Sequence, residues 1–298
     1  MRPVRTWRDA LALIGFLAPA VALIGVFVVA PAVWAVVQSF TNKSLTGPTA
    51  LDPSFVGFAN YSNLLHDGEF YSSLVKTAVF TVVSAVIGQT VLGFLIAYLM
   101  ARRPRWNLRF TPVFAAIFVL PLAAPETVAA LAWASLATGT KSGLINQAVG
   151  VFGVEPVQWL QKYAFEIIII ANIWRGITFA MVLFAAAIEG IPSSVLEAAM
   201  VDGATSRQRL LRIVVPVLRP QILIFLMLTT ITTIGIFGLV YFLTQGGPGN
   251  ATEIIGIYIY DQAFKFFDIG LGSAASGILL IVLLVLGIYY VRLMRDQV

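Results

Sequence analysis

The sequence predicts an all-α polytopic membrane protein with six transmembrane helices, and three observations lead to this prediction. Of the 298 residues, 59% are hydrophobic and only 11% are charged, whereas soluble domains carry about 25% charged residues. Long apolar stretches recur along the chain, and arginines gather in alternate loops between them. A single aqueous core cannot bury that much apolar surface. We therefore expect lipid to be the main solvent of this chain.

Six apolar stretches are long enough to cross a bilayer, whose hydrocarbon core of about 30 Å needs roughly 20 helical residues. The first stretch could be mistaken for a secretory signal, but its uncharged run is about twice as long as a signal's apolar region. We expect it to be a retained helix. Residues 1–298 then form a single transmembrane domain. The expected helices lie near residues 11–38, 76–100, 110–137, 165–188, 220–243 and 271–292.

An even number of spans puts both ends of the chain on one side of the membrane, and the basic residues indicate which side. With a cytoplasmic N-terminus, thirteen arginines lie in inner segments and five lysines lie in outer segments, a strong positive-inside asymmetry. We expect a multi-pass protein of a bacterial-type cytoplasmic (inner) membrane, with both termini cytoplasmic. The arginines would face the headgroups of the lipid bilayer, so the net charge of +5 needs no nucleic-acid partner. The inner arginines are Arg2, Arg5, Arg8, Arg102, Arg103, Arg105, Arg109, Arg207, Arg209, Arg212, Arg219, Arg292 and Arg295, and the outer lysines are Lys43, Lys76, Lys141, Lys162 and Lys265.

Several kinds of chemistry are excluded by residues that the chain lacks. There is no cysteine, and His66 is the only histidine, so neither thiol catalysis nor a histidine-cluster metal site is expected. The segment Gly139-Thr140-Lys141-Ser142 lacks the spacing of a phosphate-binding loop. We therefore expect no catalytic residues, no metal and no directly bound cofactor. The chain cannot be its own ATPase.

The longest inner loop, residues 189–219, predicts a short helix that lies across the cytoplasmic end of the transmembrane helices. Ser194 and Glu197 have the spacing of a capping box, with Pro192 just upstream. Gly203 suits the left-handed residue that ends a short helix, and Thr205 or Ser206 can cap a second, arginine-rich helix. A rigid knob of this kind can fit a groove in a soluble partner.

The spacing in this loop resembles the EAA loop of binding-protein-dependent ABC import permeases. Glu197-Ala198-Ala199 is followed by three residues, Gly203, nine residues and Ile213-Val214-Val215-Pro216, where the family usually has Leu at the position of Val215. In that family the loop is the cytoplasmic coupling helix docked on the ATP-binding subunit. The resemblance implies that Glu197 pairs with a basic residue of the ATPase; the alternative is that Glu197 only completes its own capping box. The expected ATPase-coupling residues are Glu197, Ala198, Ala199, Asp202, Gly203 and Arg207.

Two outer segments are similar to those of the sugar-type branch of this family. They are residues 55–61, Phe-Val-Gly-Phe-Ala-Asn-Tyr, and residues 243–248, Leu-Thr-Gln-Gly-Gly-Pro. Transporters of this branch are heteromeric, so the resemblance implies an ATP-binding subunit dimer that holds ATP and Mg, a second homologous permease subunit and an external solute-binding protein. The implied function is import of a sugar, a related polyol or a glycerol-phosphate. The expected contacts with the binding protein are Gln245, Gly246, Gly247 and Pro248.

Polar residues inside two predicted spans are candidates for the solute path, because polar groups in lipid are costly. Glu126 and Arg175 lie at comparable depth, so either they pair or Arg175 meets the solute. The other candidates share one face of each of two helices, and a sugar needs such hydrogen-bonding groups beside an aromatic ring. The alternatives are a structural ion pair and helix packing through hydroxyl groups. The expected path residues are Glu126, Asn172, Arg175, Phe179, Thr229, Thr232 and Thr233.

Two other functions are alternatives to import. A secondary transporter with Glu126 as its proton carrier would explain the acid in the membrane, but not the spacing of the loop. An intramembrane enzyme would need a pair of carboxylates, a cysteine or a histidine within the spans. Among the solutes that remain open, Arg175 favours a phosphorylated one.

Overall fold

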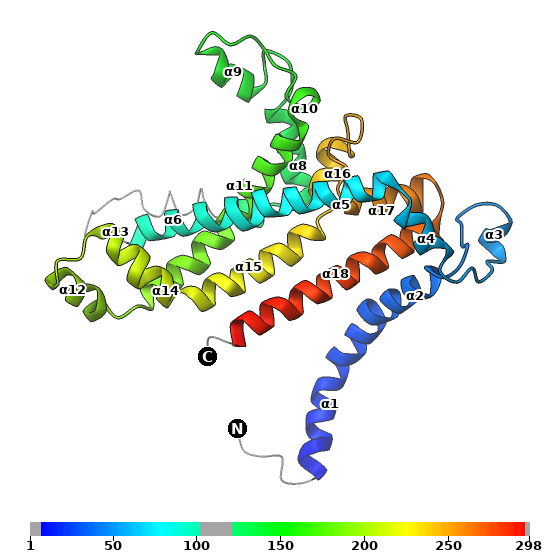
Figure 1. Cartoon of the computed structure of the whole chain (residues 1–298), viewed down its shortest axis with the longest axis horizontal. Coiled ribbons are helices and arrows are strands. Elements are labelled where there is room, and N and C mark those ends of the chain that lie inside the picture. The colour runs from blue at the N-terminus through cyan, green and yellow to red at the C-terminus, as the bar shows by residue number, and fades with distance from the viewer. Residues whose placement is uncertain (1–6, 102–120, 296–298) are drawn as a thin grey trace. The chain divides into compact units, whose positions relative to one another are not determined.

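The computed structural model describes residues 7–101 and 121–295, and every regular element in these ranges is a helix (Figure 1). The only extended pairing in this part of the chain consists of two isolated bridges, Thr41–Phe55 and Ser44–Asp268. The contacts divide the chain into two compact units. The first comprises Met1–Asp67 and Ile259–Ile281, and the second comprises Gly68–Tyr258 and Val282–Val298.

Four helices in the described ranges are long and apolar enough to cross a membrane, and a bent pair would make a fifth span. They coincide with the first, second, fourth and sixth predicted helices, although the second begins at Gly68 instead of residue 76. Residues 110–120 of the predicted third span lie outside the described part of the chain. The four helices are Gly15–Gln38, Gly68–Met100, Ala164–Glu189 and Ile269–Arg295, and the bent pair is Ser206–Val217 with Arg219–Ile234, at 68°.

Two helices predicted to be continuous are broken, so these predictions were wrong in detail. In the described part of the third span, a new helix, α8 (Glu126–Leu136), begins after Pro125. The break occurs there because proline has no N–H and clashes with the preceding turn. The fifth span ends as α15 (Arg219–Ile234) and resumes as α16 (Gly238–Thr244). Glycines 235 and 238 flank this second break. Because glycine has a low helix propensity, interrupting the helix there costs little free energy.

The first unit is held together by hydrogen bonds around the predicted outer segment 55–61. Its helices are α1 (Trp7–Ile24), η1 (Gly25–Val29), α2 (Ala30–Gln38), α3 (Pro48–Leu51), α4 (Ala59–Leu65), η4 (Asp261–Lys265) and the start of α18 (Ile269–Arg295). The buried Asn60 amide donates to the carbonyls of Ser39 and Thr41 at 2.9 and 2.8 Å. The Tyr61 and Ser39 hydroxyls lie 2.7 Å apart. Residues of segment 55–61 therefore anchor the turn that follows α2.

The second unit is built on two long helices that run side by side. One consists of α5 (Gly68–Phe80), the π-helical stretch η2 (Thr81–Gln89) and α6 (Thr90–Ala101); the other is α11 (Ala164–Glu189). α15 packs on η2 and on α11, and α16 packs on α8. The remaining elements of this unit are α9 (Leu144–Gly150), α10 (Trp159–Lys162), α12 (Ser193–Val201), α13 (Ser206–Arg209), η3 (Leu210–Val214), α14 (Val215–Val217) and α17 (Ile255–Tyr260).

Two apolar clusters form the core of this unit, and a polar layer separates them. Along α11, the first cluster ends at Ala171 and the second begins at Ala180. Along α15 and the break that follows it, the second cluster ends at Phe225 and the first begins at Ile236. The residues between these limits on both helices include most of the predicted path residues.

Candidate functional site

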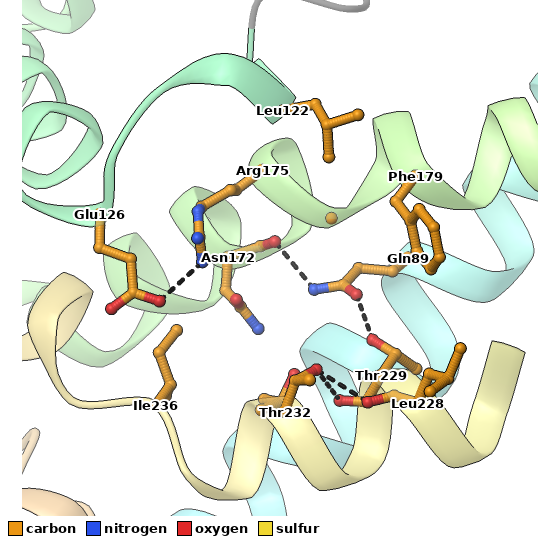
Figure 2. Close-up of a pocket in the computed structure, with 12 residues that line it drawn as sticks. Gln89, Leu122, Glu126, Asn172, Arg175, Phe179, Leu228, Thr229, Thr232 and Ile236 are labelled. Atoms are coloured by element: carbon orange, nitrogen blue, oxygen red, sulfur yellow. Dashed lines mark hydrogen bonds and ion pairs between the residues drawn. The ribbon is translucent and has the colours of Figure 1, made fainter. Parts of the chain in front are cut away.

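The polar layer of the second unit contains a cavity of about 420 Å³, shown in Figure 2. Small-molecule sites span roughly 300–1,000 Å³, so the cavity has room for a small solute. It is lined from η2, α11, α15, the start of α8 and residues next to them. The lining residues are Gln89, Leu122, Glu126, Asn172, Arg175, Gly176, Phe179, Leu228, Thr229, Thr232, Thr233 and Ile236.

An ion pair between Glu126 and Arg175 forms one wall of the cavity. The Arg175 Nη1 atom donates to Glu126 Oε1 at 3.0 Å, and 32% of the arginine and 35% of the glutamate side chain are exposed. Glu126 occupies the first turn of α8, where the helix dipole favours a carboxylate. A Cβ at Gly238 would lie 2.7 Å from Glu126 Oε2, so the glycine makes room for the carboxylate. Of the two roles expected for Arg175, pairing with Glu126 is the one that the structure contains.

Two buried amides and two hydroxyls join three helices beside this ion pair, and Figure 2 shows the bonds of Gln89. The Gln89 amide donates to the backbone carbonyl of Asn172 at 2.9 Å and accepts from the Thr229 hydroxyl at 2.5 Å. The Asn172 amide donates to the Ser84 hydroxyl at 2.7 Å. Asn172 and Thr229 therefore line the cavity and also bond neighbouring helices, so the packing alternative holds for these two side chains.

The other predicted path residues also line the cavity. Phe179 is 39% exposed, and its ring centroid lies 5.8 Å from that of Phe225. The Thr232 hydroxyl donates to the carbonyl of Leu228 in its own helix at 2.8 Å, whereas Thr233 is buried. All seven residues predicted for the path thus contribute to the same cavity.

Sequence reasoning missed Gln89 and Gly176, which shape the cavity as much as the predicted residues do. Gln89 is 3% exposed and ends the π-helical stretch η2; such stretches are frequent at functional sites. A methyl group at Gly176 would overlap the Gln89 side chain. An amide within an apolar span is costly in lipid, and this signal could have identified Gln89 from the sequence.

The predicted coupling loop folds as a short helix with a well-defined end. α12 ends in a Schellman motif: the Ala204 N–H donates to the Ala199 carbonyl at 2.9 Å, and the Gly203 N–H donates to the Met200 carbonyl at 3.1 Å. Gly203 has a φ of +76°, as predicted for the residue that ends the helix. The capping box predicted at Ser194 is not formed, because Pro192 occupies the N-cap. A capping box forms instead between Thr205 and Gln208 at the start of α13.

One face of α12 packs inward and the other is exposed. Ala199 is buried, and Leu196 packs against the second apolar cluster. Ala199 therefore attaches the helix to the unit, although it was predicted to belong to the coupling surface. The other predicted coupling residues are accessible: Glu197, Ala198, Asp202, Gly203 and Arg207.

The segment 245–248, predicted to contact a binding protein, follows α16 as a tightly bonded turn. The Gly247 N–H donates to the Thr244 carbonyl at 2.9 Å, and the Thr252 N–H donates to the Gly246 carbonyl at 3.0 Å. Gln245 adopts a left-handed conformation with φ +52°. Gln245 and Pro248 are exposed, Gly247 is half-buried and Gly246 is buried. Only part of this predicted contact segment is therefore accessible.

Comparisons with known proteins agree with this architecture. Residues 89–297 match the sequence profile of the family described as "binding-protein-dependent transport system inner membrane component". The chain is 35% identical, over 81% of its length and 80% of the relative's, to the trehalose/maltose transport system permease protein MalF of Thermococcus litoralis. It is 31% identical to the sulfoquinovosyl glycerol transport system permease protein SmoG of Agrobacterium fabrum, over 97% and 92% of the two chains. It is 29% identical to the sn-glycerol-3-phosphate transport system permease protein UgpA of Rhizobium meliloti, over 94% of each.

Solved structures share the fold. A chain of a bacterial alginate ABC transporter, crystallised with an alginate pentasaccharide-bound periplasmic protein, aligns with a TM-score of 0.84 at 21% identity, over 98% of both chains. A chain of the MetNI methionine ABC transporter in an inward-facing conformation aligns with a TM-score of 0.55 at 17% identity, over 80% of this chain and 99% of that one. The all-α polytopic membrane fold predicted from the sequence is thereby confirmed.

Proposed function

Because the chain belongs to the family of binding-protein-dependent transport system inner membrane components, we propose that it is the transmembrane subunit of an ATP-driven importer for a sugar, a related polyol or a glycerol-phosphate. The membership confirms the resemblance drawn from residues 197–216. Membership in a transport family also makes an enzyme unexpected. Relatives named for trehalose/maltose, sulfoquinovosyl glycerol and sn-glycerol-3-phosphate support a polyhydroxylated solute.

The cavity of the second unit is our candidate for this chain's half of the solute path. Its wall combines hydrogen-bonding groups with the partly exposed ring of Phe179. Sugar hydroxyls need donors and acceptors, and the C–H face of a sugar packs on aromatic rings. This combination is the single observation that most supports a sugar-like solute.

The energy for transport would come from ATP hydrolysis by partner subunits, and α12 would couple that hydrolysis to this chain. We propose an ATP-binding subunit dimer that binds ATP and Mg, a second homologous permease subunit and an external solute-binding protein that contacts Gln245 and Pro248. The exposed face of α12, with Glu197 at its centre, would dock on the ATPase. The positive-inside asymmetry supports an inner-membrane location with both termini cytoplasmic.

The decisive experiment is co-purification of the chain with its ATPase from the host membrane, followed by reconstitution and a solute screen for stimulated ATP hydrolysis. Gly203→Ala should weaken attachment of the ATPase at least fivefold, because a left-handed backbone costs a non-glycine residue about 1–2 kcal/mol and would distort the end of α12. Glu197→Ala should have a similar effect by removing the proposed partner of a basic residue.

Matched controls exist in the predicted outer loop of the same unit. Gly153 has a φ of +78°, and, like Gly203, it has nothing near its would-be Cβ. Gly153→Ala introduces the same strain away from α12, and Glu155→Ala removes an exposed carboxylate there. Both controls should leave ATPase attachment unchanged. Equal losses in controls and test variants, or uptake that needs a proton gradient and no ATP, would refute the proposal.

A further inference from the structure

The ion pair in the cavity bears on the charge of the solute. Among the described lining residues, Glu126 and Arg175 are the only charged ones, and they lie 3.0 Å apart. The lining therefore carries no net charge. From the sequence alone, the positive charge of Arg175 favours a phosphorylated solute. Its pairing with Glu126 neutralises that charge and removes the preference.

Three features of the structure hold the Glu126 carboxyl group beside Arg175. The carboxylate lies in the first turn of the eleven-residue α8, where the helix dipole stabilises negative charge. The guanidinium of Arg175 donates to it directly. Gly238 leaves room for the second carboxylate oxygen, where a side chain would collide with it.

An anionic solute would meet a double obstacle in this cavity. The positive charge that would attract it is already neutralised by the Glu126 carboxylate bonded to the guanidinium. It would also lie within a few ångströms of that carboxylate, and like charges at that separation repel each other. The pair is nevertheless about one third exposed, so its remaining donors and acceptors are accessible from the cavity.

An uncharged polyol meets neither obstacle. A sugar hydroxyl both donates and accepts hydrogen bonds, so neighbouring hydroxyls can donate to Glu126 and accept from Arg175 without breaking the pair. We propose, on the basis of the proposed function, that Glu126 is a specificity-determining residue: by neutralising Arg175, it reserves the cavity for uncharged polyhydroxylated solutes.

The test measures anion binding to the purified full-length chain in nanodiscs of phosphatidylcholine, with sn-glycerol 3-phosphate as the probe. Glu126→Gln exposes an unpaired arginine, so the probe should bind this variant at least tenfold more tightly than the wild-type chain. The double variant Glu126→Gln/Arg175→Gln restores neutrality and should show no gain. Glu166→Gln, which removes a carboxylate in the first turn of α11 outside the cavity, is the matched control and should also show no gain.

Wild-type binding as tight as that of Glu126→Gln, or an equal gain in Glu166→Gln, would overturn the proposal. Should Glu126→Gln fail to fold, the wild-type assembly still decides the question through solute-stimulated ATP hydrolysis. Stimulation by neutral sugars or polyols supports the assignment, and stimulation by a phosphate or sulfonate solute overturns it while leaving the importer function intact. Failure of the importer function would instead appear as uptake that needs no ATP.

Discussion

At the scale of single residues, Gln89 shows how one buried amide organises a membrane-embedded site. It binds the backbone of α11 through its amide nitrogen and Thr229 of α15 through its carbonyl oxygen. Gly176 opens the space that this side chain occupies. In lipid, where apolar side chains gain little by associating with one another, such hydrogen bonds and close contacts hold helices together. Gln89 therefore fixes the positions of two helices that line the cavity.

Replacing Gln89 with leucine should lower the free energy of unfolding by about 1–3 kcal/mol, because the substitution deprives the Thr229 hydroxyl of its acceptor in a buried place. The measurement is thermal or denaturant unfolding of the purified chain in detergent. Gln147→Leu is the control: Gln147 is exposed on α9, and its side-chain amide donates to the Ser142 carbonyl. Its change should stay within about 0.5 kcal/mol. Equal losses in the two variants would contradict the role assigned to Gln89.

At the scale of elements, the pairing of α6 with α11 depends on small residues at the crossing. A methyl group added at Gly93 would overlap the Ala180 methyl and lie 3.2 Å from the Ile177 carbonyl oxygen. Backbones that approach so closely gain dispersion contacts along the whole interface. The same pair of helices carries Gln89 at one end of α6 and the second apolar cluster at the other. A shift at Gly93 should therefore disturb the cavity and the attachment of α12 together.

Gly93→Ala should accordingly destabilise the chain by about 1–3 kcal/mol, the usual cost of overpacking. Adding Ala180→Gly removes the methyl group that collides and should restore part of the loss, which a double-mutant cycle measures. Gly287→Ala in α18 is the control, because nothing lies within 4 Å of its would-be Cβ. That variant should be neutral or slightly stabilising, since alanine favours a helix. Additive effects of the Gly93 and Ala180 changes would show that the two residues do not meet.

At the scale of the whole molecule, the features predicted from sequence were those that depend on local composition. Apolar runs and arginine-rich loops identify membrane helices because lipid exposure and headgroup attraction act on each segment separately. The break at Gly235 was missed because the apolar run continues through it, and the break at Pro125 because a single charged residue, Glu126, is all that interrupts the run there. Glu126 and Arg175 were expected at similar depth, but only tertiary packing decides that they meet. The sequence can show that Gln89 is a costly amide within an apolar span, but not what it binds, because its partners lie 83 and 140 positions away.

Orientation in the membrane follows from combining the fold with the charges. α9 and α10 precede α11, and α12 follows it, so a membrane-spanning α11 places Gln147 and Ser194 on opposite sides. The arginine asymmetry predicts that Ser194 faces the cytoplasm. Because the natural sequence has no cysteine, single cysteines at these two exposed positions can be labelled without background. The chain is expressed without partners that could cover α12. Gln147→Cys should then react with an impermeant maleimide in intact cells, and Ser194→Cys should react only after permeabilisation. The reverse pattern would place α12 outside the cell, where no ATPase could drive it.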